Sequence, residues 1–262
     1  MKGSIRPAIA GGAVIILLVA ALAALALWQA PRGVAQEQEP MLEYPPFPPT
    51  PTIGPNPTAP AMPQTAAVLA ADTFDDPTTA SAWTFVPLEP IRLAEQRPIW
   101  AIAGGRLEQR FTASAGNPST LETAAVTGDP GWSDYTVRVS FYDLYNGTAG
   151  LVARYSGDDP LTASYYRYRI LKNSYPATPK QVLERVRQGV ATTLVEIREP
   201  GFDERMWHVL AMDVTGDTIT VTLDGTIVVE AFDPEPLLAG RAGVYTRAMG
   251  GILFDDFSVT SR

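Results

Sequence analysis

Arginine, tyrosine and aspartate are the side chains through which this chain could do chemistry. His208 is its only histidine, and it contains no cysteine. These counts exclude disulfide bonds, a cysteine nucleophile and a zinc site built from histidine and cysteine, and they count against a histidine-based triad. We interpret His208 as structural, because it opens a strand-like stretch directly after Trp207.

An arginine- and tyrosine-rich set on adjacent candidate strands is typical of a sugar-binding surface. Aromatic rings stack on the apolar C–H faces of sugars, and arginine donates hydrogen bonds to hydroxyls or carboxylates. From Tyr165 to Ile170 side chains alternate in direction, so the arginines share one side of the strand and two tyrosines the other. The alternative is that the tyrosines pack across strands and the arginines pair with surface acids. The candidate ligand-binding residues are Tyr142, Arg154, Tyr166, Arg167, Tyr168 and Arg169.

Aspartates at both ends of the predicted domain could bind a structural calcium ion. Asp75 and Asp76 lie in its first segment, and Asp255 lies in its last, on the same side of the strand as its apolar neighbours. Calcium prefers carboxylate and backbone oxygens, and the first and last strands of such a domain commonly pair. The alternative is that these aspartates cap turns and face water.

Strands are the elements that would position these side chains. In the stretch 207–232, Ile219, Val221 and Leu223 alternate with threonines, which predicts a strand with one buried face. Thr215-Gly216-Asp217 interrupts the stretch before this strand, and Asp224-Gly225 supplies the positive φ angles of a type I′ turn after it. The stretch therefore predicts a three-stranded antiparallel meander.

Short apolar or alternating runs separated by turn residues recur from Val68 to the end of the chain. A dozen or more such runs predict an all-β, antiparallel two-sheet sandwich over residues 68–262. Apolar residues make up 46% of the chain, which is enough for a large core. The formal net charge of −8 argues against a nucleic-acid partner, because phosphate backbones are bound by clustered basic residues.

The N-terminal part has a different composition. Residues 8–28 carry no charge, a length that fits the hydrocarbon core of a bilayer, and Lys2 and Arg6 before them place the N-terminus in the cytoplasm. We therefore expect residues 1–28 to form a cytoplasmic stub and a single transmembrane helix, with the C-terminal domain outside the cytoplasm at the cell membrane. A long signal peptide cleaved near Gln36 is the alternative.

Residues 29–67 form a predicted linker rich in proline. Ten of the 24 residues from Pro40 to Pro63 are proline, which fixes φ and lacks a donor for helix or sheet. We expect a semi-rigid polyproline-II stalk that spaces the domain from the membrane.

Six segments fall in an order that resembles a known superfamily. They are AGLVARY (149–155), SYYRYRI (164–170), LERVRQG (183–189), WHVLAMDVTGDTITVTLDG (207–225), GRAGVYT (240–246) and ILFDDFSV (252–259). The domain resembles the concanavalin A-like lectin/glucanase superfamily in its laminin-G-like jelly-roll branch, near the 3-keto-disaccharide hydrolase family. The resemblance implies a jelly roll with a ligand face on one sheet, and often a calcium ion between the terminal segments.

The resemblance also sets the expected functions. Glucanases of this superfamily carry a Glu-x-Asp-x-x-Glu strand, which is absent here, because EIRE at 196–199 and DE at 203–204 lack its spacing. We therefore expect a non-catalytic carbohydrate-binding or adhesion module, with calcium as the one expected cofactor. The alternatives are a hydrolase resembling the 3-keto-disaccharide hydrolases and a structural module that binds a cell-surface protein.

Overall fold

The computed structural model describes residues 66–262, except 92–96, 111–121, 145–146, 172–178, 200 and 248–250. All of the described residues belong to the unit Thr50–Arg262. The predicted anchor and nearly all of the predicted linker lie outside them. Within the described ranges, no helix has the length and apolar character needed to cross a membrane.

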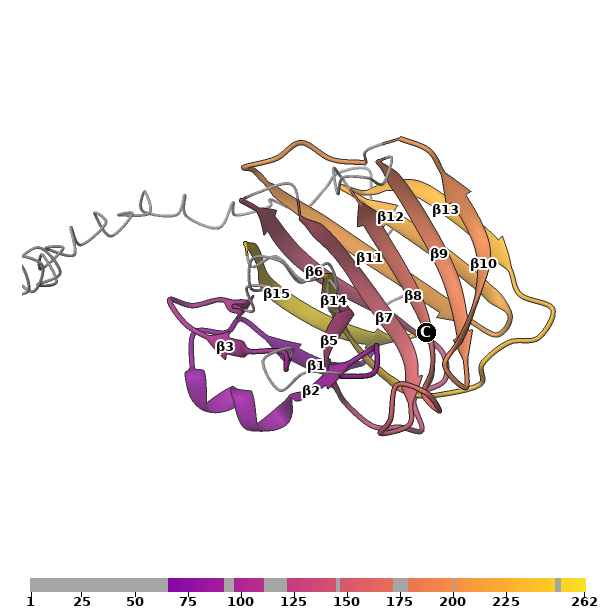
Figure 1. The fold of residues 1–262 in the computed structure, drawn as a ribbon, viewed down its shortest axis with the longest axis horizontal. Coiled ribbons are helices and arrows are strands. Elements are labelled where there is room, and N and C mark those ends of the chain that lie inside the picture. Colours follow the sequence, from indigo (N-terminus) through magenta and orange to yellow (C-terminus); the bar gives the residue numbers. More distant parts are fainter. Residues whose placement is uncertain are drawn as a thin grey trace, which may run out of the picture. The chain divides into compact units, whose positions relative to one another are not determined.

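Two antiparallel sheets form the domain (Figure 1). Sheet A contains, in spatial order, β13 (Thr226–Phe232), β12 (Thr218–Leu223), β11 (Trp207–Thr215), β6 (Tyr135–Asp143), β15 (Ile252–Ser261), β4 (Leu107–Gln109) and β3 (Trp100–Ile102), and β1 (Val68–Asp72) also pairs with β15. Sheet B contains β10 (Val190–Ile197), β9 (Lys180–Arg187), β8 (Ser164–Leu171), β7 (Thr148–Ser156), β14 (Arg241–Arg247), β5 (Glu122–Thr127) and β2 (Thr84–Pro87). The 3₁₀ helix η1 (Pro77–Ala82) lies beside the N-terminal strands.

The hydrophobic core lies between the two sheets, as the alternation of the strands requires. On β6, Val137, Val139 and Phe141 are fully buried and point toward sheet B, while Arg138 between them is exposed. Each fully buried side chain of this size stabilises the folded state by about 1.5–3 kcal/mol relative to exposure. The predicted two-sheet sandwich is confirmed.

The meander at 207–232 forms as predicted. Strands β11, β12 and β13 are consecutive neighbours in sheet A, and the alternating Ile219, Val221 and Leu223 are buried. Asp224 and Gly225 have φ angles of 51° and 79°, the left-handed values that a type I′ turn requires at both positions.

The two ends of the domain pair directly. Strand β1 runs antiparallel to β15, with Asp72 opposite Phe257. The predicted neighbourhood of the first and last strands is confirmed. The short strands β2, β3 and β5 lack an extended apolar alternation, so no sequence pattern marks them.

Candidate functional site

The outer face of sheet B, which points away from sheet A, carries the predicted arginines. Along β8, Tyr166, Tyr168 and Ile170 belong to the core between the sheets. The residues of opposite parity, Arg167 and Arg169, therefore lie on the outer face. The structure thus settles the direction that the alternation left open.

Both arginines meet Glu184, which stands opposite Arg167 on the neighbouring strand β9. From Arg167, Nε and Nη2 donate to Glu184 Oε2 at 2.9 and 2.6 Å. From Arg169, Nε donates to Oε2 at 3.1 Å and Nη2 to Oε1 at 3.0 Å. Glu184 therefore takes the two-donor edge of each guanidinium.

Glu122 joins this group from β5, three strands away from β8. Its Oε2 accepts from Arg167 Nη1, and its Oε1 accepts from Arg169 Nη1 at 3.2 Å. Strands β7 and β14 lie between β8 and β5. On β7, Gly150 stands opposite Arg169, and a Cβ there would lie 2.9 Å from the Tyr245 ring. The missing side chain at Gly150 leaves room for the arginines to reach across β7.

We call Arg167, Arg169, Glu122 and Glu184 the arginine–glutamate cluster. Their side chains are 6, 14, 11 and 7% exposed. Four charged groups so little exposed are costly unless they are paired, and each of these is hydrogen-bonded to two partners of opposite charge. The cluster is thus a pre-organised and largely buried polar group with no net charge of its own.

Tyr245 lies beneath the cluster on β14. The Arg167 guanidinium carbon lies 5.4 Å from the centroid of its ring, within the range of a cation–π contact. Burial, followed by the charge of nearby Glu122, raises the pKa of Tyr245 well above its usual value. Although Glu122 is close, the Tyr245 hydroxyl makes no hydrogen bond of ordinary geometry with any described residue.

Two glutamates on this face have pKa values shifted in opposite directions. Burial alone would raise the pKa of Glu184, but the charges of Arg167 and Arg169 outweigh burial and hold it below the usual value. Glu89, which follows β2, has a raised pKa because of burial and the charge of Glu122. Glu184 therefore loses its proton more readily than an ordinary glutamate, and Glu89 loses its proton less readily.

A second row of side chains on the same face is aromatic. The rings of Tyr155 and Tyr165 stack with centroids 5.5 Å apart, and the Arg241 guanidinium carbon lies 5.4 Å from the Tyr155 centroid. Both tyrosines are nearly fully buried, so they support the surface beside the cluster.

The predicted tyrosines of β8 lie on the other side of sheet B, in the core. Tyr166 Oη donates to Asp233 Oδ2 at 2.8 Å and accepts from Leu237 N at 3.0 Å. Tyr168 Oη donates to Gln181 Oε1. Their hydroxyls are satisfied by the protein itself, so these two residues are cross-strand packing groups, the alternative left open by the sequence.

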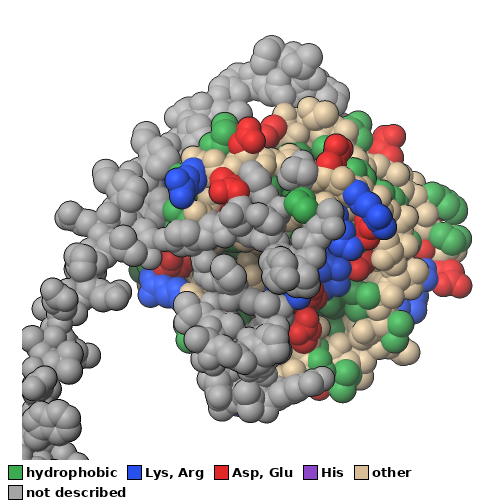
Figure 2. All heavy atoms as spheres, turned by 45° about the horizontal axis from the view of Figure 1, so that its top comes forward, with side chains coloured by type: hydrophobic (Ala, Val, Ile, Leu, Met, Phe, Trp, Pro, Cys, Tyr) green, Lys and Arg blue, Asp and Glu red, His purple; other side chains and the backbone are tan. Residues whose placement is uncertain are grey.

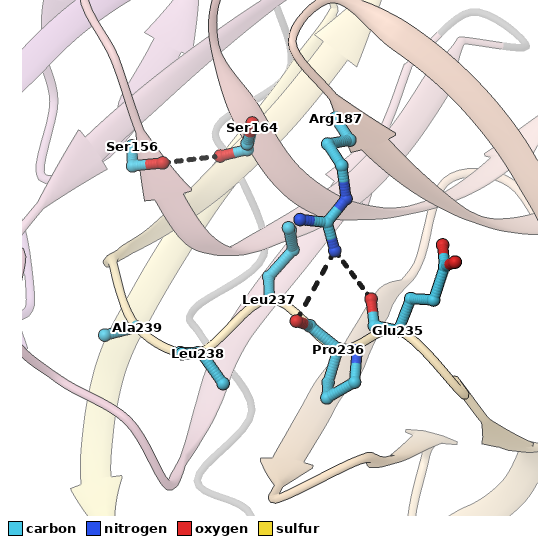
Figure 3. Close-up of a pocket in the computed structure, with 8 residues that line it drawn as sticks. All are labelled: Ser156, Ser164, Arg187, Glu235, Pro236, Leu237, Leu238 and Ala239. Carbon is cyan, nitrogen blue, oxygen red and sulfur yellow. Dashed lines mark hydrogen bonds between the residues drawn. The ribbon is translucent and has the colours of Figure 1, made fainter.

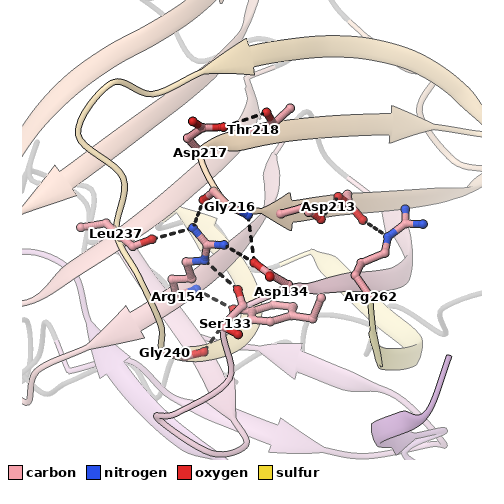
Figure 4. Close-up of polar contacts among 12 residues, drawn as sticks. Ser133, Asp134, Arg154, Asp213, Gly216, Asp217, Thr218, Leu237, Gly240 and Arg262 are labelled. Atoms are coloured by element: carbon pink, nitrogen blue, oxygen red, sulfur yellow. Dashed lines mark hydrogen bonds and ion pairs between the residues drawn. The ribbon is translucent and has the colours of Figure 1, made fainter.

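Arg154 lies in a different place from Arg167 and Arg169, at the end of the sandwich (Figure 4). Its guanidinium donates to the carbonyls of Ser133, Gly216 and Leu237 at 2.8, 2.7 and 2.5 Å, and to Asp134 Oδ1 at 3.0 Å. The side chain is 2% exposed. Arg154 therefore ties three loops together instead of facing the sugar-binding surface that was expected.

Tyr142 points outward from sheet A, on the opposite side of the domain. Its ring is tilted against Trp207 with centroids 5.5 Å apart, and Arg106 lies 5.7 Å from the Trp207 centroid on the same side. Tyr142 and the cluster therefore belong to different sheets and form no common site.

The predicted calcium ligands make protein contacts. Asp76 caps η1 by accepting from Thr78 N at 2.8 Å, and Asp75 Oδ2 accepts from Thr73 Oγ1 at 2.9 Å. Asp255 is 6% exposed and accepts from the backbone of Asp256. Over the ranges that the structure describes, no group of three or more histidine, aspartate or glutamate side chains could hold a metal ion. Calcium binding stays a prediction.

His208 is held between two acceptors. Its Nδ1 lies 2.7 Å from Asp224 Oδ2, and its Nε2 lies 2.8 Å from the carbonyl of Asp203. Its ring also contacts those of Phe141 and Phe202. The residue thus joins β11 to the β12–β13 turn, which fits the structural role expected from the sequence.

A hollow of about 720 Å³ lies where β7 ends, β8 begins and β9 ends (Figure 3). It is lined by Ser156, Ser164, Arg187, Glu235, Pro236, Leu237, Leu238 and Ala239. Arg187 turns toward the β13–β14 connection and donates to the carbonyl of Glu235 at 2.7 Å. This lining holds no aromatic ring on which a sugar could stack.

The surface charges are mixed in sign. In the view of Figure 2, acidic and basic side chains are interspersed, and apolar side chains are scattered among them. The part of that face that grey atoms leave uncovered shows no broad basic patch of the kind that binds a phosphate backbone.

Sequence reasoning missed several groups that build the site. Glu184 stands between two valines on its face of β9, so a lone acid in an apolar row was an available signal. Glu122 had none, because the segment ETAAVT resembles neither a helix nor an alternating strand. Tyr245 and Gly150 acquire a role only through the pairing of β7 with β14.

Comparisons with known proteins identify the fold. No known protein family and no curated protein matches this chain. A Bacillus subtilis protein of unknown function with a galectin-like fold is similar, with a TM-score of 0.58 and 12% identity over 75% of this chain and 97% of that one. The carbohydrate-binding module CBM66 from Bacillus subtilis has a TM-score of 0.51 and 16% identity, over 69% and 96%.

A third solved structure is an enzyme. The kappa-carrageenase from Pseudoalteromonas carrageenovora, in complex with a carrageenan oligosaccharide, has a TM-score of 0.50 and 17% identity, over 80% and 99%. At these identities the likeness shows the fold alone. The domain has a galectin-like, two-sheet jelly-roll fold, and the closer resemblance to the concanavalin A-like superfamily and to 3-keto-disaccharide hydrolases stays a hypothesis.

Proposed function

We propose that this protein is a non-catalytic carbohydrate-binding module whose binding surface is the outer face of sheet B. The observation that carries the proposal is the arginine–glutamate cluster, a polar group assembled on a sheet face beside stacked tyrosines. Sandwiches of the same fold in the comparisons include a carbohydrate-binding module and an enzyme that acts on a polysaccharide.

The hydrogen-bonding capacity of the cluster fits sugar hydroxyls. Each guanidinium has five N–H groups. Arg167 and Arg169 each use three of them on carboxylates, and no described residue takes the other two. Arg169 and Glu89 are partly exposed, at the edge of the arginine–glutamate cluster. A hydroxyl can accept from the arginines and donate to Glu89, so one sugar ring could use both.

Arg169→Lys tests this proposal. Lysine keeps the positive charge between the two glutamates but loses the planar fork. On a glycan array followed by titration calorimetry, we expect wild type to bind a defined glycan and Arg169→Lys to bind it at least about tenfold more weakly, a loss of about 1.4 kcal/mol. The matched control is Arg198→Lys, whose side chain is 80% exposed. Equal binding by all three proteins would place the glycan elsewhere.

A hydrolase is the second candidate, and the opposite pKa shifts on this face favour it. A carboxyl group that stays neutral can act as a general acid, while a charged one stabilises positive charge in a sugar transition state. Glu89 and Glu184 would take these roles. We expect an enzyme of this kind to release product from 3-keto-glycosides and to lose that activity in Glu89→Gln. Binding without product release supports the module.

A membrane anchor completes the proposal. The span 8–28 and the proline-rich linker would hold the module outside the cytoplasm, where it would meet a glycan or, in the third alternative, a cell-surface protein. Mass spectrometry of the mature N-terminus tests the anchor, and a chain that starts near Gln36 would show a cleaved signal peptide instead.

A further inference from the structure

The charges around the cluster are balanced. The described charged groups that act on Glu89 are Glu122 on β5, Arg247 on β14, and Arg167 and Arg169 on β8. With Glu89 and Glu184, the described charged groups immediately around the cluster are three arginines and three glutamates, apart from Arg241 beside Tyr155. The net charge of these six groups is zero when every carboxyl group is ionised.

One carboxylate-binding edge of each guanidinium, the Nε/Nη2 edge, is already occupied. A guanidinium binds a carboxylate most strongly through two parallel N–H groups on one edge. In both Arg167 and Arg169, the Nε and Nη2 groups of that edge donate to Glu184. Glu122 takes one N–H group of each Nη1, so each arginine keeps one N–H group on Nη1 and one on Nη2 to which a ligand hydroxyl can bind.

The pKa of Glu89 indicates that a further negative charge beside the cluster is unfavourable. This pKa is raised by burial first and by the charge of Glu122 second, and the three arginines only partly offset this. A carboxylate or sulfate on a ligand at the same edge of the cluster would meet the same desolvation and the same repulsion.

We propose that the arginine–glutamate cluster selects neutral glycans and rejects their uronate and sulfated counterparts. The balanced charges and the occupied guanidinium edges carry this inference, which rests on the proposed function of the same face. In its ionised form Glu89 balances one of the arginines, so its replacement by glutamine leaves these six groups with one excess positive charge, and the variant should tolerate an anionic ligand that the wild type rejects.

The test is an array of matched pairs, each a neutral oligosaccharide with its uronic-acid or O-sulfated counterpart, probed with the full-length protein at pH 7. We expect the neutral member to bind at least about tenfold more tightly, since like charges brought together cost several kcal/mol. Glu89→Gln should improve binding of the anionic member by about tenfold and change the neutral one little. Glu230→Gln, on β13 of the other sheet, makes the same change in net charge and serves as control.

The outcomes separate the two proposals. Equal or tighter binding of the anionic members overturns the selectivity and leaves carbohydrate binding standing. Absence of binding to every member overturns both. Relaxed selectivity in Glu230→Gln as well as Glu89→Gln would trace the effect to overall charge, and it would also overturn the role of this face.

Discussion

Buried arginines perform two different tasks in this domain. Arg154 donates to three backbone carbonyls and one carboxylate, and it holds loops at the end of the sandwich. Arg167 and Arg169 donate only to carboxylates, on a sheet face. Carbonyls do not titrate, so three of the four acceptors of Arg154 are unaffected by pH. Carboxylates do titrate, so the arrangement of Arg167 and Arg169 responds to pH and to the charge of a ligand.

The largest effect is expected at Arg154. Arg154→Met leaves three carbonyls without their donor, and each buried group left unsatisfied costs about 1–3 kcal/mol. We expect a loss of about 5 kcal/mol in the free energy of unfolding, measured by denaturant titration or as loss of soluble protein. Arg198→Met should stay within about 0.5 kcal/mol of wild type, as exposed substitutions usually do. A small effect at Arg154 would mean that the loops do not depend on it.

Arg167→Met should cost about 3–5 kcal/mol, because it leaves buried carboxylates without a partner. Its cost should also depend on pH. The folded pKa of Glu184 is lowered, so its contribution is present above the unfolded pKa, near 4.3, and is lost as pH falls through the folded value. The stability difference between wild type and Arg167→Met should therefore narrow below about pH 4.5. The difference for Arg154→Met should change less with pH, because three of the four acceptors of Arg154 are carbonyls, and equal pH dependence in both would erase the distinction.

The sequence predicts the fold through local signals. The alternation at 219–223 and the Asp224-Gly225 turn each act within a few residues, so the meander could be read directly. The parity of Arg167 and Arg169 was also readable, but its direction was not, because it depends on which face of sheet B meets sheet A. Glu122 reaches the arginines across strands 45 residues apart in sequence, and such a register has no local signal.

Arg154 shows a second reason for failure. It has the parity of Val152, which lies on the outer face, so simple alternation places it with the cluster. The structure has a bulge between Ala153 and Ser156, and Arg154 adopts a φ of 49° within it. A bulge adds a residue to one strand and re-aims the side chains around it. Nothing in AGLVARY indicates the bulge.

The next prediction concerns calcium binding by the aspartates at the two ends of the domain. At a concentration a hundredfold above its Kd, a ligand that binds only the folded state raises the free energy of unfolding by about 2.7 kcal/mol. At roughly 2–4 °C per kcal/mol, the melting temperature should rise by several degrees. Chelator should reverse the rise, and Asp255→Ala should abolish it while Asp203→Ala keeps it. No shift in the chelator-treated wild type would leave these aspartates as capping groups.

The smallest effect is expected at His208, whose ion pair with Asp224 is intermediate between the two arrangements. The carbonyl of Asp203 and the carboxylate of Asp224 both accept, so both ring nitrogens must donate, which only the protonated imidazole can do. Burial would lower the pKa of His208, but the hydrogen bonds to Asp224 and Asp203 outweigh it and raise the pKa above the usual value. The stabilisation that protonated His208 gives the folded state is therefore complete below the pKa of histidine in the unfolded chain, near 6.5. It is lost as pH rises through the higher pKa of His208 in the folded state. We expect wild type to lose about 1 kcal/mol or less across that range, and His208→Gln to show a flat profile in melting temperature against pH. Asp224→Asn should flatten it partly, because the carbonyl of Asp203 still favours the protonated ring. A slope that persists in His208→Gln would assign the pH dependence to another group.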